Sequence, residues 1–175
     1  RGMGLAMAQQ LLRPGQQLLC LSRHSHLALT ERAAAQHAAL EQWEQDLSQT
    51  RASAERLRAW LQAQPVGQFA SATLINNAGV IPPIAPLSSS APGDLAQALR
   101  VGLEAPLLLC AAFLGATEHW AIPRKVLNIS SGLGRRAMAS QAAYCAAKAG
   151  MDHFTRCLAL DEALKPHGAK VCSLA

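Results

Sequence analysis

Residues 128–148, N-I-S-S-G-L-G-R-R-A-M-A-S-Q-A-A-Y-C-A-A-K, contain the pattern that decides the fold. The stretch leaves an apolar strand, passes through a loop and enters a helix that we expect over residues 142–164. Tyr144 and Lys148 are four residues apart, so they share one face of that helix. Ser131 follows the strand directly, at the edge where open parallel sheets bind their ligands. The stretch therefore predicts a strand–helix unit with three polar side chains at the carboxyl end of its strand.

Strands and helices alternate on both sides of this stretch. Apolar runs predict strands at residues 17–22, 73–76, 125–130 and 170–175, and helical patterns predict helices at 2–12, 27–40, 53–63, 94–117 and 142–164. Topology also requires a strand at residues 40–45, where the composition gives a poor strand signal. Buried strands in this order predict an α/β fold: a doubly wound, Rossmann-like parallel sheet with helices on both faces. The length predicts a single domain over residues 1–175.

The three polar residues have the chemistry of a proton-transfer site. A phenol with a pKa of about 10 is a poor acid–base group at neutral pH, but a nearby ammonium favours the phenolate. Tyr144, the only tyrosine of the chain, would then exchange a proton at working pH with the help of Lys148. Ser131 would hydrogen-bond the substrate oxygen. The alternative is that a helical Tyr and Lys fall four residues apart by chance. This alternative is weakened because Ser131 and the Asn-Asn-Ala-Gly motif precede the pair in the expected order.

Two glycine-containing motifs precede this site. One is Asn76-Asn77-Ala78-Gly79, which ends an apolar strand, where small residues allow a cofactor to lie against the backbone. Its alternative interpretation is a simple turn. The other is Arg1-Gly2-Met3-Gly4, which opens the first helix, where backbone amides and the helix dipole favour a phosphate. Its alternative interpretation is an ordinary helix start.

Charged residues after two N-terminal strands suit the remaining parts of a dinucleotide. Arg23 ends a strand at the position where an arginine favours a ribose 2′-phosphate and an acidic residue favours the free hydroxyl. Arg1 is a second candidate for that phosphate. Asp46-Leu47 follows the strand expected from topology, and its carboxylate would accept a hydrogen bond from the adenine amino group. The alternatives are a solvated surface arginine and a helix cap formed by Asp46.

The composition argues against several other classes of function. Half of the residues are hydrophobic and 15% are charged, which suits a packed core rather than disorder. The net charge of +5 is scattered along the chain, so nucleic-acid binding rests on net charge alone. The five cysteines form no C-x-x-C pair, so we expect no metal site and a reducing, cytoplasmic location. We also expect no membrane segment, because no uninterrupted apolar run reaches about 18 residues.

With these motifs in order, the chain resembles the short-chain dehydrogenase/reductase family over nearly its whole length. Arg1-Gly2-Met3-Gly4 is similar to the end of the family's T-G-x-x-x-G-x-G turn, and Asp46-Leu47 is similar to its adenine-side D-[LV] pair. The Asn-Asn-Ala-Gly run is identical to the family's N-N-A-G motif. Tyr144 and Lys148 fit Y-x-x-x-K, with Ser131 placed 13 residues before the tyrosine as in the family.

This resemblance implies a nicotinamide cofactor, NADP(H) in view of Arg23, and hydride transfer between it and a small carbonyl or alcohol substrate. Tyr144 would be the proton donor in reduction, Lys148 would hold the nicotinamide ribose, and Ser131 would orient the carbonyl. Ile129 would join the residues that bind the cofactor. The identity of the substrate and the direction of the reaction stay open at this point.

The chain departs from the family at both ends and in one helix. The family's first strand with its glycine turn, and the segment that follows Ala175, are absent, so we expect a chain cut at both ends. Gly102 stands in Val101-Gly102-Leu103 where the family has an asparagine that supports a water-linked proton relay. This substitution keeps a second hypothesis open, a non-catalytic relative that binds cofactor or a partner. A helical glycine costs about 1 kcal/mol relative to alanine, which indicates a bend or close packing there.

The resemblance also carries an expectation about assembly. Family members commonly pair through the helices expected here at residues 94–117 and 142–164, so a homodimer or homotetramer is implied. Within the family, three short runs are similar to sepiapterin reductases and related benzil reductases: Asn128–Ser131, Tyr144–Ala146 and Leu158–Glu162.

Overall fold

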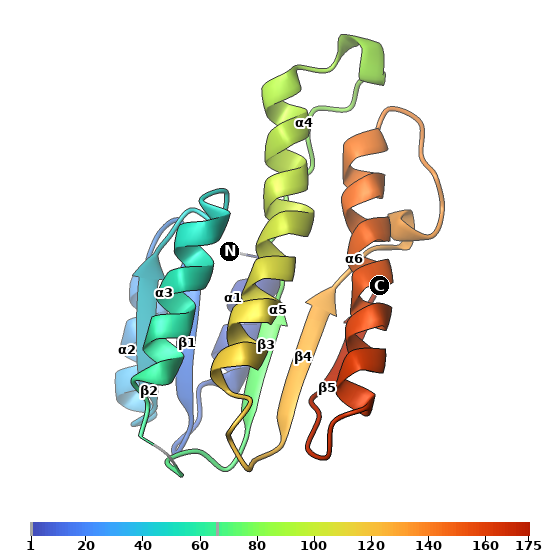
Figure 1. Cartoon of the computed structure of the whole chain (residues 1–175). Helices are drawn as coiled ribbons and strands as arrows, with labels where there is room; N and C mark the ends of the chain where they lie inside the picture. Colours follow the sequence, from blue (N-terminus) through green and yellow to red (C-terminus); the bar gives the residue numbers. More distant parts are fainter. Residues whose placement is uncertain (1, 66) are drawn as a thin grey trace. The chain divides into compact units, whose positions relative to one another are not determined.

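The computed structural model describes residues 2–65 and 67–175, which form two compact units, one up to Gln49 and one from Thr50 (Figure 1). The first unit contains α1 (Gly2–Leu11), β1 (Gln17–Ser22), α2 (Leu27–Ala35) and β2 (Ala39–Glu44). The two strands pair in parallel, from Gln17 opposite Ala39 to Ser22 opposite Glu44. The core of this unit consists of small and branched apolar side chains from α1, the residue that follows it, and α2: Ala8, Leu12, Leu29 and Ala33.

The helix expected over residues 27–40 is shorter than the sequence indicated. It ends at Ala35, because His37 adopts a left-handed conformation (φ 50°) and the amide of Ala38 donates to the carbonyl of Ala33. Leu40 therefore belongs to β2, where it packs against the core of this unit. The strand that topology required is confirmed, and Trp43 is buried within it.

The second unit is built on a three-stranded parallel sheet. Its strands β3 (Ala72–Asn76), β4 (Arg124–Ile129) and β5 (Lys170–Leu174) are hydrogen-bonded in the order β3-β4-β5. The strand pairs are in register at Asn76 opposite Asn128 and at Ile129 opposite Leu174, so the strands end together at one edge of the sheet. Helices α5 (Ala105–Ala116) and α6 (Ala142–Ala163) pack on the sheet, and α3 (Thr50–Gln62) packs against α5 (Figure 1).

The helix expected over residues 94–117 is continuous but not uniform. It begins as α4 (Pro92–Leu99), passes through the π-helical segment η2 (Arg100–Glu104) and continues as α5. Gly102 lies within the π-helical segment, and a Cβ built on it would lie 3.0 Å from the Cβ of Ala147 on α6. Of the two alternatives that a glycine in this helix indicated, a bend or close packing, the close packing is present, and the backbone around the glycine is π-helical.

This same helix, Pro92–Ala116, has the length and apolar composition of a membrane span. More than half of it is buried inside the protein, where it packs against α3 on one side and α6 on the other. The apolar side chains that these contacts cover include Leu109, Phe113 and Leu114. A helix between two others needs apolar residues on more than one face, so the packing accounts for its composition.

Candidate active site

Tyr144 and Lys148 lie in the first two turns of α6, beside the carboxyl end of β4. The Nζ atom of Lys148 lies 5.8 Å from the centre of the Tyr144 ring. The same Nζ donates a hydrogen bond of 2.7 Å to the carbonyl oxygen of Ile129, the last residue of β4. Only 3% of the Lys148 side chain surface is exposed. The predicted pair is therefore brought together, and the strand end fixes where the ammonium lies.

Burial affects the charge of this lysine. Removal from water lowers the pKa of Lys148 below its usual value, because the charged form loses its hydration. The carboxylate of Asp152, one turn further along α6, opposes this effect by favouring the ammonium. An ammonium has three donors, and the carbonyl of Ile129 takes one of them. Two donors are thus left for groups that approach the site.

The Asn-Asn-Ala-Gly segment approaches the same lysine from β3. Asn76 ends the strand and is buried, whereas Asn77 and Ala78 are partly exposed and Gly79 is exposed. A Cβ built on Gly79 would lie 3.7 Å from Lys148 Nζ, so the backbone of this segment passes beside the ammonium. The structure thus joins three motifs that are distant in the sequence: the end of β3, the end of β4 and the start of α6.

Ser131 lies two residues after Ile129, in extended backbone (φ −158°) before the short 3-10 turn η3 (Gly132–Gly134). Its hydroxyl oxygen accepts a hydrogen bond of 3.2 Å from the amide of Leu133. The hydroxyl hydrogen is then free to donate to another acceptor. Because the side chain is only partly buried, a carbonyl oxygen of a ligand is a suitable acceptor.

A buried polar network lies beneath these residues, and the sequence analysis did not identify it. The Nδ2 atom of Asn76 donates to Oδ1 of Asn128 at 2.8 Å, and Nδ2 of Asn128 donates to Oγ1 of Thr155 at 2.8 Å. Cys110 Sγ lies 3.3 Å from Asn76 Nδ2, and burial raises the pKa of the Cys110 thiol to about 11. The network ties the ends of β3 and β4 to α5 and α6. An asparagine inside an apolar strand, Asn128, was the available signal.

Gly102 occupies the position where the resemblance leads one to expect an asparagine. The Cβ contact described above is with Ala147, which immediately precedes Lys148. Any side chain at position 102 would push against α6 at the turn that carries the lysine. The glycine thus has a packing role at the site, in addition to leaving out the side chain of the expected relay.

The residues expected to bind the adenosine half of a dinucleotide lie in the first unit. Arg1 is outside the described residues; Gly2, with a φ of 58°, starts α1, Met3 is exposed and Gly4 is partly buried. Arg23 is exposed directly after β1, as a solvated arginine would also be.

The other expected residue in this unit, Asp46, makes a local hydrogen bond. Its Oδ1 accepts from the amide of Ser48 at 2.9 Å, and Leu47 is partly buried. The hydrogen bonds from Ser48, and secondarily the charge of Arg23, lower the pKa of Asp46. This geometry is that of a local turn that precedes α3, rather than the helix cap that was the alternative interpretation, and it leaves the second carboxylate oxygen for a ligand.

Within residues 2–65 and 67–175, no three His, Cys, Asp or Glu side chains are grouped so that they could hold a metal ion. The residues around Lys148 do fit part of a nicotinamide dinucleotide. Two free donors on a fixed ammonium suit the hydroxyl groups of a ribose, and Gly79 places backbone without a side chain beside that ammonium.

Comparison with known proteins gives consistent similarities. A sequence profile of the short chain dehydrogenase family matches residues 1–175. A benzil reductase, (S)-benzoin forming, of Bacillus cereus is 29% identical over 175 residues, which cover 100% of this chain and 70% of the relative. The chain spans about two thirds of the length of the curated relatives it matches.

Two solved structures show the same similarity in three dimensions. A short-chain dehydrogenase/reductase from Burkholderia vietnamiensis is 37% identical, with a TM-score of 0.84 over 100% of this chain and 79% of the other. A metagenomic short-chain oxidoreductase in complex with NADP is 30% identical, with a TM-score of 0.85 over 99% and 75% of the two chains. The expected α/β, Rossmann-like fold class and the family resemblance are both confirmed.

Proposed function

The chain belongs to the short chain dehydrogenase family, and from this premise we propose that it is an NADP-dependent oxidoreductase acting on a carbonyl or alcohol substrate. The observation that carries the proposal is the position of Lys148 Nζ, which is fixed by the Ile129 carbonyl at 2.7 Å and lies 5.8 Å from the centre of the Tyr144 ring. A buried ammonium beside the only phenol of the chain is an arrangement for moving a proton.

In this proposal each residue has a distinct task. Tyr144 gives its proton to the carbonyl oxygen in reduction and takes it back in oxidation. The ammonium of Lys148 stabilises the phenolate by charge attraction and uses its free donors to hold the ribose. Ser131 donates its free hydroxyl hydrogen to the carbonyl oxygen and orients it. When bound, the nicotinamide supplies the hydride in reduction and receives it in oxidation.

The proposal assigns cofactor recognition to residues in both parts of the sequence, as one dinucleotide-binding domain over residues 1–175. Asn77, Ala78, Gly79 and Ile129 are assigned to the nicotinamide side. The adenosine side is assigned to the N-terminal residues Arg1, Gly2, Met3, Gly4, Arg23, Asp46 and Leu47. Arginine at position 23 favours the 2′-phosphate of NADP over NAD, and the NADP complex of a relative that is 30% identical supports this choice.

The first test is hydride transfer measured with NADPH and a panel of aromatic and aliphatic ketones. Replacing Tyr144 with Phe removes the proton donor, so turnover should fall by about 10²–10⁴-fold while binding of NADPH persists. Equal, negligible rates for both proteins would reject the enzyme and favour the second candidate, a non-catalytic cofactor-binding relative. Gly102, which lacks the expected side chain, is the observation that favours this second candidate.

The cofactor assignment has a separate test. Fluorescence titration with NADPH and NADH should show tighter binding of NADPH, and Arg23→Ala should remove most of that preference because one charged partner of the 2′-phosphate is lost. Equal binding of the two cofactors by the unmodified protein would overturn the choice of NADP and leave hydride transfer with NAD possible.

We also propose a homodimer or homotetramer in the cytoplasm. Exposed leucines lie on α5 (Leu107), on α6 (Leu160) and directly after α6 (Leu164). All five cysteines are free thiols, which suits a reducing compartment. Light scattering of the purified protein gives the mass of the assembly, and a monomer would contradict this part of the proposal.

A further inference from the structure

Asp152 is a buried carboxylate to which the proposed mechanism gives no task. It lies on α6 one turn after Lys148, and only 9% of its surface is exposed. Neither carboxylate oxygen has a hydrogen-bond partner in the part of the chain that the structure describes. A charged group that is removed from water without hydrogen bonds is unfavourable unless an opposite charge lies nearby.

The 3-10 turn η3 covers this carboxylate. A Cβ built on Gly134 would lie 2.9 Å from Oδ2 of Asp152 and 3.0 Å from the carbonyl carbon of Lys148. A side chain at position 134 would therefore collide with both residues. The absence of a side chain there lets the turn after Ser131 pack directly onto the part of α6 that carries Lys148 and Asp152.

Other charged groups near this part of α6 are directed elsewhere or lie in exposed loop. Arg156 uses its Nε for the backbone carbonyl of Asp152 and contacts His153 through Nη2. Arg135 and Arg136 follow η3 and are exposed.

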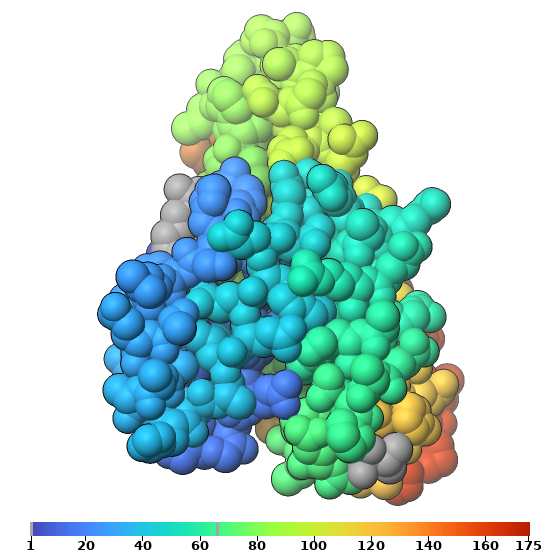
Figure 2. Space-filling view, turned by 90° about the vertical axis from the view of Figure 1, so that its left-hand side faces the viewer, coloured from blue at the N-terminus to red at the C-terminus, as the bar shows by residue number. Residues whose placement is uncertain are grey.

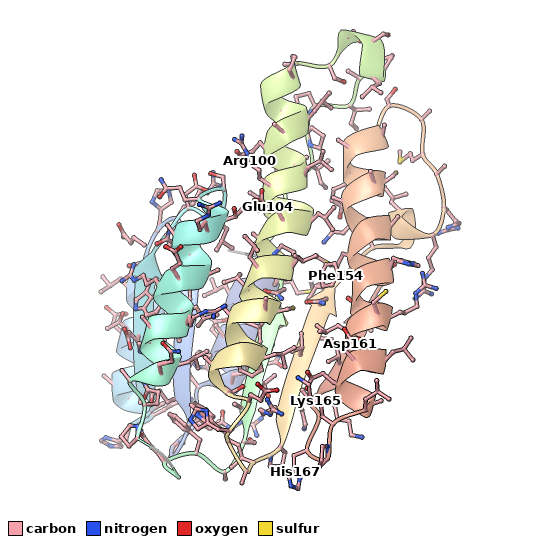
Figure 3. All side chains as sticks on the ribbon, in the orientation of Figure 1. Arg100, Glu104, Phe154, Asp161, Lys165 and His167 are labelled. Atoms are coloured by element: carbon pink, nitrogen blue, oxygen red, sulfur yellow. The ribbon has the colours of Figure 1, made fainter. Side chains whose placement is uncertain are left out.

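The long helix packed against α6 carries three charged groups, of which Asp94 is exposed in its first turn and the other two are directed away from α6. Glu104 accepts a hydrogen bond from Thr50 on α3, and Figure 3 shows Arg100 on the side of its helix that faces away from α6. The segment that follows β3 has no titratable side chain between Asn76 and Asp94. The buried ammonium of Lys148, with the phenol of Tyr144 beyond it, is thus the charge that faces Asp152.

We propose that Asp152 is a positioning residue for Lys148: its buried carboxylate is the counter-charge that keeps Nζ an ammonium against the Ile129 carbonyl. The two side chains are four residues apart on one helix face, the spacing at which opposite charges attract. Among residues 2–65 and 67–175 the carboxylate has no hydrogen-bond partner, so its charge acts on the lysine without competition from these residues. This inference rests on the proposed function, because the ammonium is what the proposed chemistry requires.

The electrostatic effects on Lys148 are consistent with this task. Burial lowers the pKa of Lys148, and the charge of Asp152 raises it. Removing that charge leaves the effect of burial without opposition, so Lys148 should lose its proton at a lower pH.

The test measures the protonation of Lys148 directly, without cofactor or substrate. The chain has four lysines, so ¹³C-lysine labelling gives few side-chain NMR signals, and Lys148→Arg identifies the signal of Lys148. In Asp152→Asn, which keeps the shape of the side chain, the titration midpoint of Lys148 should move to lower pH, with the other lysines unchanged. The matched control is Asp161→Asn, an exposed aspartate on the same helix, which should leave the midpoint of Lys148 in place.

An unchanged midpoint of Lys148 in Asp152→Asn would overturn the inference, whatever the activity of the protein. Asp152→Ser is a second neutral variant for the case in which the asparagine variant does not fold, and it should move the midpoint in the same direction. Hydride transfer then adds a second readout: the alkaline loss of activity should begin at lower pH in either variant. A moved midpoint in a protein without any hydride transfer would reject the proposed function and leave the Lys148–Asp152 pair in place.

Discussion

Two buried carboxylates on α6, Glu162 and Asp152, lie in contrasting surroundings. Near the C-terminal end, both oxygens of buried Glu162 accept hydrogen bonds of 2.8 Å, from Lys165 Nζ and from the amide of Ala169. The guanidinium of buried Arg124 lies 3.9 Å away and donates to the carbonyl of His167. In the middle of the helix, one turn after Lys148, both oxygens of Asp152 lack hydrogen bonds among the described residues. Figure 3 shows Lys165 and His167 near the C-terminal end of α6, away from the start of the helix.

This difference separates a carboxylate that is hydrogen-bonded within the fold from one that is not. Burial by itself raises the pKa of Glu162, but the hydrogen bonds from Ala169 and Lys165 outweigh it and lower that pKa. The bond to Glu162 raises the pKa of Lys165, whereas burial lowers the pKa of Lys148. In the cluster around Glu162 the carboxylate is satisfied, although Nε and Nη1 of Arg124 have no hydrogen-bond partner among the described residues. A buried carboxylate whose own oxygens are both unbonded is suited to act on a nearby charge.

The largest expected effect comes from removing the carboxylate of Glu162. Glu162→Ala leaves Arg124 buried without its counter-charge and removes the acceptor of the Ala169 amide, so the free energy of unfolding should fall by about 3–5 kcal/mol. Urea denaturation measures this change. Activity per folded molecule should persist, because the cluster lies at the opposite end of α6 from Tyr144.

The matched control for this cluster is Glu118, which also contacts Lys165, at 3.3 Å, but is largely exposed. Glu118→Ala should change the free energy of unfolding by less than about 1 kcal/mol, as is usual for surface pairs. A loss of similar size in the two variants would show that hydrogen-bond satisfaction does not account for the stability of this cluster.

The second effect concerns Cys110, in the satisfied network beneath the site. Burial raises the pKa of its thiol from 9.0 to about 11, so the unfolded chain loses this proton first as the pH rises. The free energy of unfolding should therefore fall between pH of about 9 and 11, by up to about 2–3 kcal/mol from this group. In Cys110→Ala that part of the pH dependence should disappear, as followed by denaturation at several pH values. Cys157→Ala, at an exposed thiol, should keep the pH dependence of the unmodified protein.

Much of the fold and of the site could be predicted from local sequence patterns. The apolar runs identified β1, β3 and β4 nearly to the residue, and the spacing of Tyr144 and Lys148 placed them on one helix face. Strand β2 was recoverable only from topology, because Leu40-Glu41-Gln42-Trp43 lacks the composition of a buried strand. The end of α2 was placed too late, since a left-handed histidine has no strong signal in an Ala-rich helix.

Other features depend on contacts between distant segments, which local patterns do not encode. Gly134, which is distant in the sequence, packs over the carboxylate of Asp152. Asn128 is hydrogen-bonded to Asn76 on β3 and to Thr155 on α6. The loop after β3 is likewise placed by tertiary contacts, with the amide of Ala85 donating to the carbonyl of Ser140. Figure 2 shows this loop and the start of α4 (light green) exposed on the surface.

The third effect tests the close packing beside Lys148. Gly102→Ala adds a methyl group 3.0 Å from the Cβ of Ala147, so overpacking should cost about 1–3 kcal/mol, partly offset by the better helix propensity of alanine. Thermal denaturation measures the balance. The rate of hydride transfer should fall as well, because the added methyl group pushes on the helical turn that carries Lys148. A variant that is more stable than the unmodified protein would show that α6 yields at this contact.

The smallest effect provides the control for that substitution, at the other end of the same long helix. Gly115 lies in α5, is exposed and has nothing within 4 Å of a built Cβ. Gly115→Ala should therefore raise the free energy of unfolding by about 0.5–1 kcal/mol through helix propensity and unfolded-state entropy alone. If the free energy of unfolding falls in Gly102→Ala and rises in Gly115→Ala, Gly102 is required for close packing at the site. The same gain at both positions would instead mean that Gly102 is tolerated rather than required, and would remove the steric reason for its place beside Ala147.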